Sequence, residues 1–172
     1  MNQDNNNVGG RIGRLFFGWA ITLTIIMFIA NYLLDQSNNP NQHISSYTNP
    51  DGRTELVLKQ NRHGHYVATG MINGHTVTFL LDTGATSVSI PASIANAIGL
   101  KRGYPYQAST ANGVIQVYST QIDNIRLGNI VLHDVHGSIN PHMAGTESIL
   151  LGMSFLRHVE MTQRGNTLIL RQ

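Results

Sequence analysis

The chain has 172 residues, a formal net charge of +2 and no cysteine. This length suffices for one domain of ordinary size with additional terminal segments. The absence of cysteine excludes disulfides, thiolate metal ligands and a cysteine nucleophile. The small charge excess is not gathered into a run of Lys and Arg, so the sequence gives little support to nucleic-acid binding.

The N-terminal part contains one long apolar segment. Residues 1–14 form a polar, Asn-rich leader that we expect to be disordered. Residues 15–34 carry no charged side chain, and a helix of this length, at ~1.5 Å per residue, crosses the ~30 Å hydrocarbon core of a bilayer. Trp19 and Tyr32 lie near its two ends, where aromatic side chains collect at membrane interfaces. We therefore expect a single transmembrane helix at 15–34.

The charges that flank this segment predict its orientation. Arg11 and Arg14 precede it, and no Lys or Arg follows until Arg53, so the positive-inside rule places the N-terminus in the cytoplasm. A cleaved signal peptide would have a shorter apolar region, ~7–15 residues, and a small-x-small cleavage site, which "ANYLLDQSNN" does not offer. A buried core helix is disfavoured because the segment is apolar on all faces.

The composition changes twice after the apolar segment. Residues 35–54 are rich in Asn, Ser and Pro and predict a flexible tether. From 55 to 172 the sequence alternates between short β-rich runs and turn signals, with two short helices. Asn73-Gly74 and Asn112-Gly113 each predict a tight hairpin. The pattern indicates an all-β domain at 55–172.

The stretch "TVTFLLDTGATSVSIP" places the carboxylate of Asp82 at the end of an apolar strand. Gly84 permits a tight turn and the close approach of another backbone. One carboxylate in such a turn accepts local amide hydrogen bonds and can be a simple turn cap. Two carboxylates ~3 Å apart share one proton, so one acts as general base on a water while the other acts as general acid.

Three segments resemble those of retropepsin-like (clan AA) aspartic proteases. "LLDTGATS" resembles the active-site loop, "ILLGMSFL" at 149–156 resembles the second signature, and the hairpin "STANGVIQV" lies between them, where the family carries its flap. The resemblance covers about 55–172 and is closest to the bacterial, membrane-anchored branch. It implies a closed retropepsin-like acid-protease β-barrel with one or two short helices, preceded by a single transmembrane helix. It also implies an inner-membrane protein with a periplasmic domain.

The resemblance implies a catalytic role for Asp82, Thr83 and Gly84. No other aspartate after the apolar segment is followed by Thr-Gly or Ser-Gly, so a dyad requires a homodimer in which each subunit supplies Asp82. Thr83 would then brace the partner's loop. The C-terminal strand "NTLILRQ" could pair within its own subunit or across the dimer interface. The residues that we expect to bind the substrate peptide are Ala85 and the flap residues Ala111, Asn112, Gly113 and Val114, with Ile115 and Val117 flanking them.

Two functions remain open from the sequence. The first is an aspartic endopeptidase acting on proteins or peptides with water as nucleophile and no cofactor. The second is a non-catalytic, membrane-tethered dimeric peptide-binding module of the same fold. The intact "DTGAT" favours the enzyme, because a binding module has little use for a carboxylate pair at its interface. His63 and His65 would lie on one face of a strand, but no third ligand has a clear spacing, so we expect no metal site.

Overall fold

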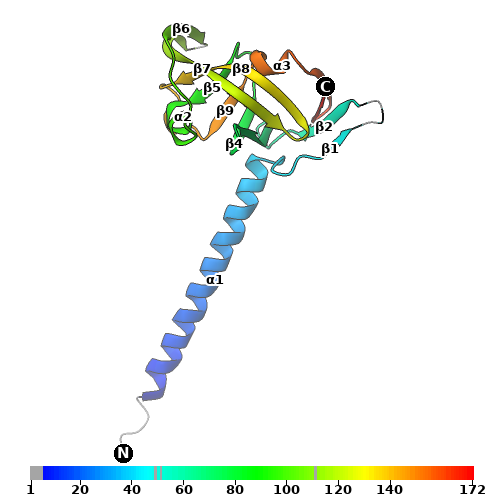
Figure 1. The fold of residues 1–172 in the computed structure, drawn as a ribbon. Helices are drawn as coiled ribbons and strands as arrows, with labels where there is room; N and C mark the ends of the chain where they lie inside the picture. Colours follow the sequence, from blue (N-terminus) through cyan, green and yellow to red (C-terminus); the bar gives the residue numbers. More distant parts are fainter. Residues whose placement is uncertain (1–5, 49, 51, 111) are drawn as a thin grey trace, which may run out of the picture. The chain divides into compact units, whose positions relative to one another are not determined.

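The computed structural model describes residues 6–48, 50, 52–110 and 112–172. These residues form two compact units, the first ending at Ser37 and the second running from Asn38 to Gln172. Figure 1 shows the elements of each unit.

Helix α1 extends from Asn6 to Asn38 and forms the first unit, except that its last residue belongs to the second. It therefore begins inside the leader at 1–14 that we expected to be disordered, because adding a residue to an existing helix costs far less than nucleating one. The window Arg14–Asn38 is long and apolar enough to cross a membrane. The side chains of residues 15–34 are exposed within the unit.

The second unit is built mainly from strands, with two short helices. Its elements in chain order are β1 (Ser46–Thr48), β2 (Thr54–Lys59), β3 (Val67–Ile72), β4 (His75–Leu81), β5 (Val88–Pro91), α2 (Ala92–Ala97), β6 (Pro105–Thr110), β7 (Gly113–Leu127), β8 (Ile130–Asn140), β9 (Ser148–Leu151), α3 (Met153–Leu156), β10 (Glu160–Arg164) and β11 (Thr167–Arg171).

Seven of these strands form one sheet, in which β3, β4, β9, β5, β8 and β7 close into a barrel and β6 extends from β7. Their order in the sheet is β3-β4-β9-β5-β8-β7-β6, and β3 also pairs with β7. Met71 lies opposite Arg126 and Ile72 opposite Ile125 in this additional pairing, so the sheet closes on itself and protects those strand edges. The expectation of an all-β domain with a closed barrel and short helices is confirmed.

Only the first of the two Asn-Gly pairs forms a two-residue hairpin loop. Ile72 pairs with His75 across the first loop, and Asn73 and Gly74 have φ values of 48° and 81°, as a type I′ turn requires. In the second hairpin, Gly113 pairs with Thr110 and is the first residue of β7, so the Asn112-Gly113 pair does not form the loop as we expected.

The barrel is filled from alternate positions of its strands. Val77 and Phe79 of β4 are buried, and the intervening Thr78 is only partly buried, as the two-residue period of a strand dictates. A Cβ placed on Gly70 would lie 2.7 Å from Phe79 Cε2, so a glycine is needed where β3 meets this ring. The Phe79 ring therefore packs directly against the backbone of β3 at Gly70.

A second, four-stranded sheet has the order β1-β2-β11-β10. The C-terminal strand β11 pairs on one edge with β2 and on the other with β10, so both of its edges are used within its own chain. Arg171 Nε donates to Glu55 Oε2 at 2.7 Å, and its Nη1 lies 3.7 Å from Glu160 Oε1. The hydrogen bond to Glu55 and its negative charge raise the pKa of Arg171.

The segment expected to be a flexible tether at 35–54 is ordered over part of its length. Asn41 is buried, with 4% of its surface exposed. Its Nδ2 donates to Lys59 O at 2.9 Å and to Val67 O at 2.6 Å, and its Oδ1 accepts from Lys59 N–H at 2.8 Å. β1, at 46–48, pairs with β2. The expectation fails here because one side-chain amide supplies hydrogen-bond partners for two strands.

We predict that Asn41→Ala lowers the free energy of unfolding by ~2–4 kcal/mol, because it leaves three backbone groups of β2 and β3 without their hydrogen-bond partner. The measurement is denaturant unfolding of the full chain in detergent. The matched control is Gln42→Ala, at an exposed neighbouring position, which should change stability by less than ~0.5 kcal/mol. Equal effects of the two substitutions would contradict this role for Asn41.

Candidate active site

Asp82 follows directly after β4, where the chain turns away from the barrel. Its N–H donates to Leu151 O of β9 at 3.2 Å, and its carbonyl accepts from Ala85 N–H at 3.2 Å. Its carboxylate Oδ1 accepts from Gly84 N–H at 2.9 Å. Asp82 is partly buried, whereas Thr83 and Gly84 are exposed. The loop therefore fixes the carboxylate and leaves its own tip open to solvent or to another chain.

Strand β9 lies between the two strands that flank this loop. β4 runs parallel to β9, with Leu80 opposite Leu150. β5 pairs with the other edge of β9 in the antiparallel sense, through Ser89 opposite Leu150. The chain from β4 to β5 must therefore cross the end of β9, which brings together two segments that are far apart in the sequence.

Gly152 makes this crossing possible. It is buried, and a Cβ at this position would collide with the backbone oxygens of Ala85 and Ser87. The next two residues hold the loop directly, since Met153 N–H donates to Ala85 O at 2.8 Å and Ser154 N–H donates to Thr86 O at 3.0 Å. The absence of a side chain at Gly152 thus lets the start of α3 support the residues that follow Asp82.

Sequence reasoning missed Ser154, which is buried behind the loop. Its Oγ accepts from Val88 N–H at 3.0 Å and donates to His136 O at 2.7 Å. The hydroxyl therefore links the beginning of β5 to β8 and α3. Nothing in the local sequence distinguishes this serine from a surface residue, because its partners lie 66 and 18 positions away.

Sequence reasoning also missed an apolar wall on the two strands, β4 and β9, that end at the Asp82 loop. Leu80, two residues before Asp82, and Leu150 are neighbours on the barrel face that points away from the core, and both are partly buried. Ser89 continues the row, and its Oγ lies 3.5 Å from Met143 Sδ. The strand register was needed to find these residues.

The hairpin of β6 and β7 carries the residues expected at the flap. Asn112 and Gly113 are exposed, and Asn112 N–H donates to Thr110 Oγ1 at 3.2 Å. Ala111 lies outside the described residues. Val114 is 63% exposed and Val117 is buried, with 1% exposed, so the apolar side chains of this hairpin do not share one surface.

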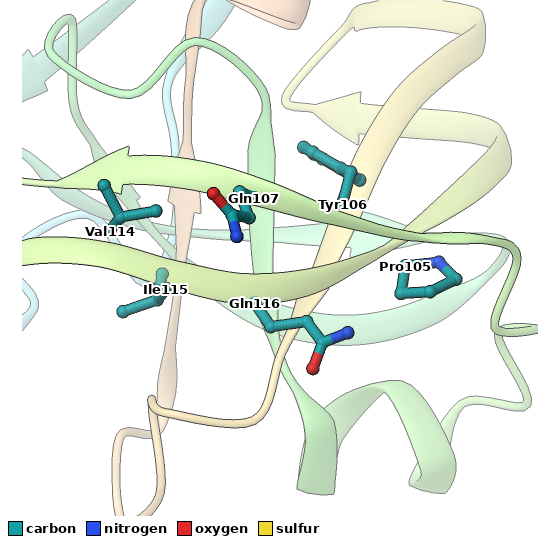
Figure 2. Close-up of a pocket in the computed structure, with 6 residues that line it drawn as sticks. All are labelled: Pro105, Tyr106, Gln107, Val114, Ile115 and Gln116. Carbon is teal, nitrogen blue, oxygen red and sulfur yellow. The ribbon is translucent and has the colours of Figure 1, made fainter.

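An open pocket of about 320 Å³ lies across this hairpin. Figure 2 shows its lining side chains, which come from both strands: Pro105, Tyr106, Gln107, Val114, Ile115 and Gln116. The pocket therefore combines apolar and amide groups.

The described residues contain no group of three or more His, Asp or Glu side chains that could hold a metal ion. His63 and His65 lie in the loop between β2 and β3, and not on a strand as we expected. Their ring centroids are 6.4 Å apart.

Known proteins resemble this chain in sequence and fold. The family of gag-polyprotein putative aspartyl proteases matches residues 68–158. An uncharacterized protein in the cobV 5′ region of Sinorhizobium sp is 32% identical over 119 residues, which is 67% of this chain and 51% of that protein. The chain therefore spans about half the length of this relative.

A crystal structure of a retropepsin-like aspartic protease from Rickettsia conorii has a similar fold. The TM-score is 0.57 at 22% identity, and the match covers 74% of this chain and 94% of the other. The matched family segment, 68–158, is more than half of the 172 residues and includes the Asp82 loop, the β6–β7 hairpin and α3. The retropepsin-like barrel agrees with this family. Because the family match covers more than half of the chain, the chain belongs to the family of gag-polyprotein putative aspartyl proteases.

Proposed function

We propose that the protein is an aspartic endopeptidase whose catalytic dyad consists of Asp82 from two subunits of a homodimer. The observation that carries the proposal is the Asp82 loop, in which Gly84 N–H, Ala85 N–H and the Leu151 carbonyl fix the residue. Its partly buried carboxylate lies next to an exposed tip. Family membership and the retropepsin-like fold support the same reaction.

The chemistry requires two carboxylates that share one proton. The ionised member removes a proton from a water molecule, and the water oxygen attacks the peptide carbonyl carbon. The protonated member donates its proton to the carbonyl oxygen, giving a neutral tetrahedral intermediate. Collapse of the intermediate breaks the C–N bond after the amine has been protonated. Asp82, Thr83 and Gly84 are the residues to which we assign this site.

A second chain is needed because one subunit offers a single suitable carboxylate. Asp123 and Asp134 are exposed on β7 and β8, and neither is followed by Thr-Gly or Ser-Gly. Thr83 is exposed and makes no side-chain hydrogen bond among the described residues, so its hydroxyl is available to a partner's loop. An isologous contact between two identical loops is the simplest way to pair them.

We assign substrate binding to Ala85 and the hairpin tip at Ala111, Asn112, Gly113 and Val114. An extended peptide between the tip and the Asp82 loops would be recognised largely through its main chain. The apolar wall of Leu80 and Leu150 favours apolar side chains next to the cleaved bond.

We further propose that residues 15–34 anchor the enzyme in the inner membrane, with the N-terminus in the cytoplasm and the catalytic domain in the periplasm. The length and hydropathy of α1 support a span, and Arg11 and Arg14 support the orientation. The peptide-binding module without catalysis remains the alternative, and the first experiment below separates the two.

We predict that Asp82→Asn abolishes peptide cleavage, with a loss of at least ~10²–10⁴-fold, because the substitution removes the general acid–base pair. The full chain in detergent is incubated with an unbiased peptide mixture at acid to neutral pH, and new termini are read by mass spectrometry. Asp123→Asn is the matched control and should keep full activity. No cleavage by a dimeric wild type would favour the binding module, and cleavage by Asp82→Asn would refute the assignment.

We predict that a heterodimer with one Asp82→Asn subunit is inactive, because the dyad needs both carboxylates. Co-expression with two different affinity tags allows purification of this species. Independent sites in each subunit would instead leave about half of the wild-type activity, given the symmetry of the assembly.

We predict that Ser154→Ala lowers kcat and changes KM much less, because the loop after Asp82 loses part of its support. The free energy of unfolding should also fall by ~1–3 kcal/mol, since Val88 N–H loses its buried partner. Thr120→Ala is the control, since its buried hydroxyl donates to Lys101 O at 2.9 Å, away from the loop. The control should lose similar stability at unchanged kcat; equal kcat losses would indicate a purely structural role for Ser154.

A further inference from the structure

The four-stranded sheet has a basic end that is not apparent in the sequence. Lys59 of β2 and Arg164 of β10 both lie opposite Thr167 of β11, and both side chains are exposed. The loop that follows β2 adds the exposed side chains of Arg62, His63 and His65. We refer to Lys59, Arg62, His63, His65 and Arg164 as the basic surface.

Charge is unevenly distributed along this sheet. Its other end carries Glu55 and Glu160 on either side of Arg171. Residues 56–81 contain no Asp or Glu at all. Among the described residues, none of the five side chains of the basic surface forms an ion pair with a carboxylate.

The loop of the basic surface contacts Asn38, the first residue of the folded unit. Asn61 Nδ2 donates to Asn38 O at 3.0 Å, and Asn61 Oδ1 accepts from the N–H groups of His63 and His65 at 2.9 and 3.0 Å. This asparagine shapes the loop and joins it to Asn38. In the sequence, Asn38 follows closely after Leu34, the last residue of the proposed membrane span.

We propose that the basic surface binds the anionic phospholipid headgroups of the membrane that α1 crosses. The proposal rests on the anchoring part of the proposed function and is independent of the proposed catalysis. Guanidinium and ammonium groups bind phosphate oxygens through charge-assisted hydrogen bonds, and imidazole N–H groups can add neutral ones. Asp35, next to the span, subtracts one charge, so a net attraction remains.

Headgroup binding would give the folded unit a second attachment besides its covalent link to α1. Each Lys or Arg near an anionic surface contributes about fivefold in binding, and the attraction weakens with salt. Three such residues would keep the domain at the membrane surface for most of the time. Substrate segments close to that surface would then meet the enzyme more often.

The test uses trypsin, which cleaves after exposed Lys and Arg, on the full chain in lipid nanodiscs. The discs contain either phosphatidylcholine alone or phosphatidylcholine mixed with phosphatidylglycerol. We expect the mixed discs to slow cleavage after Arg62 by roughly tenfold, and added salt to restore it. Cleavage after Arg102, in an exposed segment without regular structure, serves as the internal control and should not change.

Substitutions identify the residues responsible. Lys59→Gln with Arg164→Gln keeps the cleavage site at Arg62 and should remove most of the protection. The matched control is Arg126→Gln with Arg157→Gln, which removes two exposed cations elsewhere and should leave the protection intact.

Equal cleavage after Arg62 in both kinds of disc would overturn the proposal. So would protection that survives the Lys59 and Arg164 substitutions. A chain that does not enter nanodiscs would refute the proposed span and this inference with it. Because Asp82→Asn protein can be used throughout, failure of the proposed catalysis would leave the result unaffected.

Discussion

The close contact between Gly152 and the backbone of Ala85 and Ser87 is the constraint on which the candidate site depends. β9 lies between β4 and β5, so the Asp82 loop has to cross its end. A side chain at Gly152 would fill the space that the loop occupies. Once the loop is in place, Met153 and the following serine can donate their N–H groups to it. A closed barrel thereby becomes a rigid support for one carboxylate.

The folded unit pairs its C-terminal strand within one chain, but it supplies only one of the two carboxylates that the proposed reaction needs. β11 is paired on both edges within its own chain, and Asn41 joins the entering chain to β2 and β3. The C-terminal strand therefore needs no second chain to pair its two edges. The proposed active site, in contrast, holds only half of a dyad. Folding and catalysis would thus be separated, with the domain stable alone and active only as a pair.

The proposed attachment of the domain to the membrane also depends on a few local contacts. One asparagine, Asn61, shapes the loop that carries Arg62 and joins it to Asn38, where the folded unit begins. A covalent anchor alone would leave the domain free to reorient. A basic surface at the point of attachment would restrict that freedom, and it would do so reversibly because the attraction is electrostatic.

The sequence by itself determined the features that depend on neighbouring residues. The Asn73-Gly74 turn, the apolar run before Asp82 and the apolar helical segment at 15–34 are local patterns, because backbone conformation and periodic burial act over a few residues. Only the tertiary structure decided what depends on distant contacts. Asn41 was expected in a flexible tether, yet it is buried because its amide meets β2 and β3. Ser154, the pair of Leu80 and Leu150, and the clustering of Lys59 with Arg164 all follow from strand register, which no single segment contains.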